Sequence, residues 1–182
     1  ATGGIGGVHH GWATRPDVSA DLGVIAETPM AVVSAGIKSI VDVPATGEWL
    51  ETLGVPILGL GTSEMPCFIA GTDPDAPAVQ QVHDEAEAAE LIQLHWQQVN
   101  GAGGVLLTVP LGAELRLPHE LVDAANTDAE QAAEAAGVAG PARTPFLLSH
   151  MAEATDGRSL IANITLLLQN AGVAATLACR LS

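Results

Sequence analysis

Basic residues are scarce in this sequence. Lysine and arginine together number six, against 21 aspartate and glutamate residues, and the formal net charge is −15 at pH 7. Sequence-independent binding to nucleic acid requires clustered cations that release counterions from the phosphates, whereas the arginines here are scattered along the chain. We therefore expect no nucleic-acid partner. A phosphorylated small molecule would have to be held by backbone N–H groups, hydroxyls and local cations.

Cysteine is also scarce. Cys67 and Cys179 lie far apart and lack the spacing of metal ligands, which predicts free thiols in a reducing cytoplasm. No signal peptide is visible. One long apolar segment, 159–179, is interrupted by amides such as Asn170. We therefore expect a buried core helix there rather than a membrane span, and no membrane partner.

Apolar runs alternate along the chain with segments of helical periodicity. With 182 residues, 48% of them hydrophobic, the chain can bury one substantial core, so residues 1–182 are interpreted as a single domain. Alternating strands and helices predict a layered α/β fold. The predicted strands span 30–35, 55–60, 67–70 and 104–109. The predicted helices span 15–27, 39–53 with a break at Pro44, 84–99, 118–136, 144–155 and the chain from Ser159 onward.

The single lysine, Lys38, closes an apolar run that begins at Met30. We expect this run to be a buried strand that places the amine at its carboxyl end, after a turn at Gly36. An ammonium taken out of water loses hydration, which favours the neutral amine that can attack a carbonyl. Lys38 is therefore interpreted as a nucleophilic or Schiff-base lysine. The alternative is a helix-start residue whose amine extends into solvent.

The chain opens with a glycine-rich stretch at 1–10. It falls short of a dinucleotide-binding fingerprint because the third glycine is missing. One interpretation is a nest of backbone N–H donors for a phosphate, assisted by the Thr2 hydroxyl and by His9. The alternative is a plain flexible terminus.

Two pairs of polar residues suggest binding roles. Asp17 and Asp21 are four residues apart with Ser19 between them, and on one helical face their carboxylates could hold a magnesium or manganese ion. The alternative is a solvated acidic helix start. Asn163 and Asn170 are seven apart on one flank of the final helix. Their amides require partners, either the backbone or a ligand.

Six motifs together resemble a known family. They are ATGGIGGVH at 1–9, DVSADL at 17–22, VSAGIKSIVD at 33–42, ETLGVP at 51–56, TPFLL at 144–148 and NI at 163–164. In this order they resemble pseudouridine-5′-phosphate glycosidase, the family also called indigoidine synthase A-like.

The resemblance implies reversible cleavage of the C–C glycosidic bond of pseudouridine 5′-phosphate to uracil and ribose 5-phosphate. It also implies a three-layer α/β/α sandwich with a mixed sheet, a homotrimer, and Mn²⁺ or another divalent cation. Lys38 matches the lysine that forms an imine with C1′ of the opened ribose, and Asp17 the metal-binding aspartate. The matched substrate-binding positions are Thr2, Gly4, His9, Ser19, Ala20, Asp21 and Asn163.

One departure from the family bears on activity. Members are about half as long again, and their amino-terminal part carries a glutamate proton donor and a second lysine, neither of which can be located here. These residues would then be the carboxyl-terminal portion of such a domain, with a separate amino-terminal chain supplying the missing groups, or the activity is lost. The alternative functions are a related enzyme acting on another C-glycoside and a non-catalytic assembly subunit.

Overall fold

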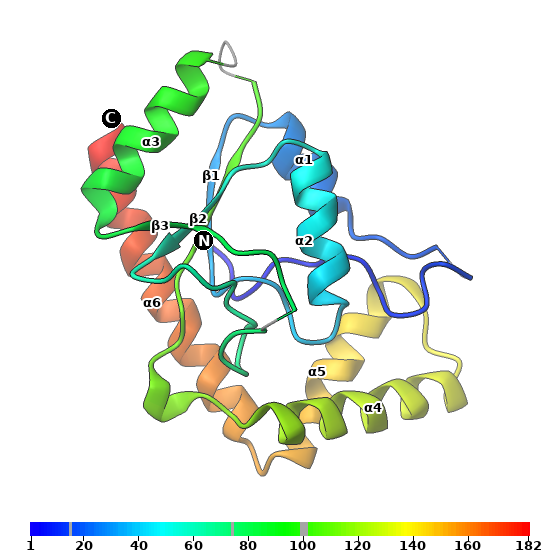
Figure 1. The fold of residues 1–182 in the computed structure, drawn as a ribbon. Coiled ribbons are helices and arrows are strands. Elements are labelled where there is room, and N and C mark those ends of the chain that lie inside the picture. The colour runs from blue at the N-terminus through cyan, green and yellow to red at the C-terminus, as the bar shows by residue number, and fades with distance from the viewer. Residues whose placement is uncertain (15, 74, 99–101) are drawn as a thin grey trace.

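A four-stranded parallel sheet forms the centre of the computed structural model, which describes residues 1–14, 16–73, 75–98 and 102–182. The strands lie in the order β1-β4-β2-β3, and their bounds are Ala31–Ser34 for β1, Ile57–Leu60 for β2, Gln80–Val82 for β3 and Val105–Thr108 for β4 (Figure 1). All three pairings between these strands are parallel. Within the described ranges, antiparallel pairing occurs only as isolated bridges such as Val8 to Val18.

The central strand β4 is buried along its whole length, as a parallel strand covered on both faces must be. Successive side chains of a strand point to opposite faces. Leu106 belongs to the hydrophobic cluster shared with α1 and α2, whereas Val105 and Leu107 belong to the cluster shared with α3. The sheet therefore separates two cores.

Helices cover both faces of the sheet. α1 (Ala20–Glu27) and α2 (Val43–Thr52) lie on one face, and α3 (Glu85–Gln98) and α6 (Arg158–Leu181) lie on the other (Figure 1). α4 (His119–Ala135) and α5 (Arg143–Ala154) pack against each other at one end of the molecule, near two short 3₁₀ turns at Ala113–Leu115 and Gly140–Ala142. The predicted α/β sandwich is confirmed, whereas the expected mixed sheet differs from the described one, whose four strands all pair in parallel.

The first helix begins later than predicted. α1 starts at Ala20, and Ser19 is its N-cap, whose hydroxyl accepts the backbone N–H of Asp21 at 3.2 Å. The preceding residues are extended because Val18 bridges the amino-terminal stretch at Val8. The prediction of a helix from position 15 onward was therefore wrong over 16–19, and Arg15 itself lies outside the described residues.

Three other local predictions also need correction. Pro44 does not break a helix but lies in the first turn of α2, where its missing N–H costs nothing. The strand predicted at 67–70 is a turn, since the backbone N–H of Ala70 donates to the Cys67 carbonyl at 2.9 Å. The short strand β3 was missed because it has no apolar run: its two glutamines are exposed and only its valine is buried.

The last helix is buried on one side only. Gly157, in a left-handed conformation, precedes α6, and Ser159 lies in the first turn rather than at the cap. The core-facing residues of α6 are Ser159, Ala162, Leu166, Asn170 and Leu177. By length and composition alone α6 could cross a membrane, and only 22% of its most apolar window is buried in the domain. The helix that we predicted to be a buried core helix is thus a surface helix with one buried face.

Candidate active site

The glycine-rich start of the chain is ordered against the sheet. Residues 2–9, here called the amino-terminal segment, run beside the end of β1 and beyond it. The N–H of Thr2 donates to the Val33 carbonyl at 2.9 Å, and the N–H of Ile5 donates to the Gly36 carbonyl at 3.0 Å. The segment therefore runs alongside the β1 edge of the sheet and is held there by backbone hydrogen bonds, unlike the plain flexible terminus that was the alternative.

Lys38 lies against this segment, four residues beyond the end of β1. Its backbone N–H donates to the Ile5 carbonyl at 3.0 Å. A Cβ atom placed on Gly4 would lie 3.2 Å from Cγ of Lys38, closer than such atoms usually pack, so the glycine allows the lysine stem to lie close to the segment. Gly36 makes the intervening turn with φ 80°, where a Cβ would overlap the carbonyl oxygen of Pro66. Lys38 is half-buried.

Phe68 is a site residue that the sequence did not indicate. Its φ of 53° is rare for a bulky residue. Its backbone N–H donates to the Ala35 carbonyl at 3.0 Å, and its ring lies against Gly3 and Gly4, where added Cβ atoms would be 3.3 and 3.0 Å from ring carbons. The Phe68 ring therefore packs against the two glycines that contact Asn163 of α6 and Lys38. No motif signals it, because residues 67–70 read as a strand.

Asn163 approaches the same segment from α6. A Cβ atom on Gly3 would lie 3.0 Å from Oδ1 of Asn163. The Asn163 side chain also lines a small cavity together with Phe68 and with residues of α5 and α6. Asn170 has a structural role, since its Nδ2 donates to the Thr2 carbonyl at 2.8 Å. The two asparagines thus share one partner segment, and Asn163 also borders a cavity.

Ser19 and Asp21 contact the next two glycines. The carboxylate of Asp21 accepts the backbone N–H of Gly6 at 2.7 Å, and the backbone N–H of Ser19 donates to the Gly7 carbonyl at 2.9 Å. A Cβ on Gly6 would lie 2.5 Å from Oγ of Ser19. Ala20, the first residue of α1, is exposed between them.

His9 and Asp17 lie at the far end of the segment. The backbone N–H of His9 donates to the Asp17 carbonyl at 2.9 Å, and the Asp17 side chain is exposed. Both residues line a cavity that also includes Glu130 and Glu134 of α4. Within the described ranges, the buried Nδ1 of His9 has no hydrogen-bond partner.

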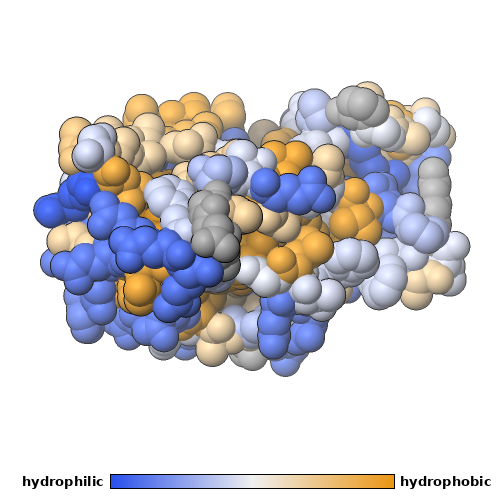
Figure 2. Space-filling model, turned by 90° about the horizontal axis from the view of Figure 1, so that it is seen from above, coloured by the Kyte–Doolittle hydropathy of each residue, from blue (hydrophilic) through white to orange (hydrophobic). Residues whose placement is uncertain are grey.

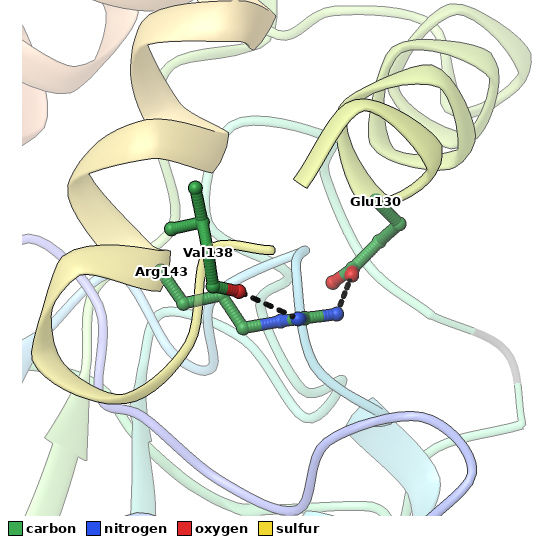
Figure 3. A network of polar contacts seen from close by, with 3 residues as sticks. All are labelled: Glu130, Val138 and Arg143. Carbon is green, nitrogen blue, oxygen red and sulfur yellow. Dashed lines mark hydrogen bonds and ion pairs between the residues drawn. The ribbon is translucent and has the colours of Figure 1, made fainter. Parts of the chain in front are cut away.

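Arg143 supplies the positive charge of that cavity. Its guanidinium pairs with the carboxylate of Glu130 and donates to the Val138 carbonyl at 3.3 Å (Figure 3). The guanidinium is half-buried, and Figure 3 shows it extended between α5 and α4. The pair therefore links α4 to α5 beside His9 and Asp17.

The pairing of Asp17 and Asp21 on one helical face does not occur. Asp17 lies in the extended stretch before α1, and the Asp21 carboxylate is used by Gly6. Among the described residues, no group of three or more His, Cys, Asp or Glu side chains could hold a metal ion. The exposed Asp17 could still hold a cation that keeps most of its water shell, as magnesium and similar hard ions do.

Thr46 is a second residue that the sequence did not indicate. It is fully buried, and its Oγ1 accepts the backbone N–H of Val8 at 2.9 Å while donating to the Asp42 carbonyl at 2.6 Å. Asp42 is the N-cap of α2. The start of α2 therefore holds the segment from one side, as the start of α1 holds it from another.

The buried thiol near the site is not a candidate nucleophile. Burial, together with the nearby carboxylates of Asp73 and Asp123, raises the pKa of the Cys67 thiol to about 12. The thiolate is the reactive form of cysteine. Lys38 is therefore the better candidate nucleophile in this part of the molecule.

Comparisons with known proteins agree on one family. The family described as Indigoidine synthase A like protein matches residues 1–180. A pseudouridine-5′-phosphate glycosidase of Chloroflexus aurantiacus is 49% identical over 100% of this chain and 60% of its own length. The protein of the same name from Sorangium cellulosum is 44% identical, over 100% of this chain and 56% of its own.

Two solved structures share the fold. The prealnumycin C-glycosynthase AlnA, in complex with ribulose 5-phosphate, has a TM-score of 0.88 and 38% identity, covering 99% of this chain and 59% of that one. An indigoidine synthase A-like protein of Thermotoga maritima has a TM-score of 0.85 and 34% identity, covering 97% and 57%. The chain thus spans somewhat less than two thirds of the length of these relatives.

Proposed function

This chain belongs to the indigoidine synthase A-like family, and we propose that it carries the lysine-bearing part of a site that cleaves or forms C-glycosides of a pentose phosphate. The finer proposal is reversible cleavage of pseudouridine 5′-phosphate to uracil and ribose 5-phosphate. The names of the glycosidase relatives support it.

The observation that carries this proposal is the position of Lys38. Its stem lies against Gly4 and its backbone is bonded to Ile5. Asp21, Ser19 and Asn163 contact neighbouring glycines of the same segment. Lys38 and these polar side chains therefore all contact one short stretch of backbone, and we infer that together they would hold a sugar phosphate and a base.

A C–C glycosidic bond explains why an amine is needed. No leaving oxygen can be protonated, so the paired carboxylates of ordinary glycosidases would not suffice. The Lys38 amine would bond to C1′ of the ribose as the C1′–O4′ bond breaks, which opens the ring and leaves the ring oxygen as a hydroxyl after it takes up a proton. As the C–C bond breaks, its electron pair leaves with the base, which takes up a proton at that carbon. C1′ is left double-bonded to the lysine nitrogen, and water hydrolyses this imine to release the sugar phosphate.

We also propose a divalent cation, manganese or a similar ion, bound by Asp17 and by water. His9 and Asp17 line one cavity, and the unpaired Nδ1 of His9, among the described residues, could accept from a bound water. Such an ion would supply positive charge for the phosphate, which the net charge of −15 otherwise repels. The homotrimer and the cytoplasmic location stay predictions.

A second candidate is synthesis of a C-glycoside on a different acceptor. The similarity to the prealnumycin C-glycosynthase supports it, since that structure holds a pentose 5-phosphate. Lys38 would form the same imine with the sugar, and only the base-binding part of the site would differ. Asn163, which lines a cavity beside Phe68, is the residue that we expect to contact the base, so the two candidate functions would differ there.

Reductive trapping tests the lysine imine directly. The chain is incubated with ribose 5-phosphate and borohydride and then digested for mass spectrometry. A parallel sample also contains the part of a relative that this chain does not match. Because Lys38 is the only lysine, the sole other primary amine is the amino terminus. We expect the sugar adduct on the peptide that contains Lys38.

The matched control is Lys38→Arg, which keeps the charge but cannot form an imine. We expect this variant and Lys38→Ala to lose the adduct and turnover while keeping the unfolding temperature. Adduct found only on the amino terminus, or full uracil release by Lys38→Ala, would refute the proposal. A wild-type chain that stays unmodified even with the complementing segment would favour the third interpretation, a non-catalytic assembly subunit.

A further inference from the structure

The outer face of α6 is a continuous apolar stripe. It consists of Leu160, Ile161, Ile164, Leu167 and Leu168, here called the α6 stripe, whose members are between 41% and 71% exposed. Their spacing places them on one side of the helix, within about a third of its circumference. The core-facing residues, Ala162 and Leu166 among them, lie on the opposite side. The stripe is therefore additional to the face that α6 already buries.

The stripe reaches the candidate active site. Leu160, its first member, lines the same cavity as Asn163 and Phe68, between α5 and α6. Whatever covers the stripe would therefore also close this cavity on the side of Asn163. On the surface seen from above, hydrophobic side chains gather along the upper left margin, and further hydrophobic patches lie between hydrophilic residues in the middle of the view (Figure 2).

We propose that the α6 stripe is the docking surface for the polypeptide that completes the family fold, the part that relatives have outside the region matched by this chain. Both solved structures cover nearly all of this chain with TM-scores of 0.88 and 0.85, yet two fifths of each has no counterpart here. A contiguous apolar patch of this kind on a soluble domain marks an interaction surface. The proposal does not depend on the proposed chemistry.

A membrane fits the stripe less well. The opposite flank of α6 makes polar contacts with the rest of the domain: Nε2 of Gln169 donates to the Pro110 carbonyl at 3.0 Å, and Nδ2 of Asn170 donates to the Thr2 carbonyl at 2.8 Å. Insertion of α6 into lipid would break both contacts and leave these amides without partners.

A second copy of the chain also fits less well. Each copy carries a net charge of −15, so two copies repel each other at low ionic strength. The stripe contains no charged residue that could pair with a partner copy. Self-association through the stripe would therefore have to overcome this repulsion by apolar contact alone.

Co-expression tests the proposal. The tagged chain is produced with the segment of the Chloroflexus aurantiacus relative that this chain does not cover, and the purified material is measured by light scattering. We expect a one-to-one complex with the wild-type chain. Ile164→Asp should reduce the amount of co-purified segment about tenfold or more, because it buries a charge in the interface.

The matched control is Val24→Asp on α1, on the other face of the sheet. Val24 is 51% exposed and Ile164 50%, so both variants add one charge at equal exposure. Val24→Asp should retain the complex, and circular dichroism should show both variants folded. Equal capture by the two variants, or no complex with the wild-type chain, would overturn the proposal. So would stripe-dependent self-association or vesicle binding of the chain alone.

Discussion

The carboxylate of Asp21 accepts the backbone N–H of Gly6 at 2.7 Å, across fifteen residues of sequence. The first turn of α1 is thereby tied to the amino-terminal segment. The same segment holds Lys38 through Ile5. Asp21, which we expect to touch substrate, therefore also has a structural role.

Replacing Asp21 should reveal that structural role. Asp21→Ala leaves the Gly6 N–H without its acceptor and should lower the free energy of unfolding by about 1 kcal/mol. Asp21→Asn keeps an acceptor oxygen and should lose less. Urea unfolding of the three proteins measures the difference, and an Asp21→Ala protein as stable as the wild type would contradict the prediction.

Thr46 offers a sharper test of how the segment is anchored. Thr46→Val has nearly the same shape but removes the acceptor of the buried Val8 N–H, so we expect a loss of about 1–3 kcal/mol in stability. Thr46→Ser keeps the hydroxyl and is the control. If denaturant unfolding finds the serine variant less stable than the valine variant, the hydroxyl is not what anchors the segment.

Two glycine substitutions should change the stability of the fold in opposite directions. A Cβ on Gly4 meets Phe68 at 3.0 Å and Lys38 at 3.2 Å, so Gly4→Ala should cost about 1–3 kcal/mol by overpacking. Gly23 is within α1 with nothing inside 4 Å of the added atom, so Gly23→Ala should add about 0.5–1 kcal/mol. Thermal denaturation of both variants checks the signs, and a stabilising Gly4→Ala would show that the glycine is not needed there.

The two cysteines should differ in reactivity. Burial raises the pKa of the Cys67 thiol to about 12, whereas Cys179 is exposed near the end of α6. With iodoacetamide at pH 8, mass spectrometry of the native protein should find label on Cys179 only. Both thiols should react in denaturant, which serves as the control. Labelling of native Cys67 at the rate of Cys179 is the result that this description does not allow.

Asp84 should make α3 sensitive to acid. Its carboxylate accepts the backbone N–H groups of Glu87 and Ala86, which hold its pKa below the ordinary value of 3.8. The stabilisation is therefore present above that value and is lost as the pH falls through the lowered pKa. Asp84→Asn keeps the cap without the titration.

The measurement compares the two proteins at several pH values. Thermal denaturation from pH 7 to pH 3 should show the wild type losing its advantage over Asp84→Asn below about pH 4. A constant difference across that range would mean that the carboxylate charge does not contribute.

Regular elements could be predicted because burial has a clear period in sequence. β4 is an uninterrupted apolar run, and α3 and α4 repeat their apolar residues at helical spacing. The start of α1 could not be predicted, because the pairing of Val18 with the distant Val8 overrides the helical tendency of 16–19.

The position of Lys38 after a strand was also readable, since the lysine follows an apolar run and a glycine turn. The apolar run could not reveal which residues from other parts of the chain pack around the lysine and the amino-terminal segment. Phe68 adopts its left-handed conformation because of the turn at 67–70, and Thr46 reaches Val8 across 38 residues. Such contacts depend on tertiary packing, which leaves no periodic trace. A nucleophilic lysine and a cation at the aspartates were hypotheses from residue type and position, whereas the imine with C1′ and the assignment of the metal to Asp17 came from family resemblance, and all of them stay predictions.

The amino-terminal segment has a practical consequence for protein engineering. Lys38, the start of α1, the start of α2 and the amides of α6 are all positioned by contacts with this segment. Replacing one residue of the segment by that of a homologue would therefore disturb several of these contacts together. Swapping residues 2–46 as one cassette would preserve most of them. Substrate preference could then be altered from the α6 side, where Asn163 lies outside the cassette and borders a cavity.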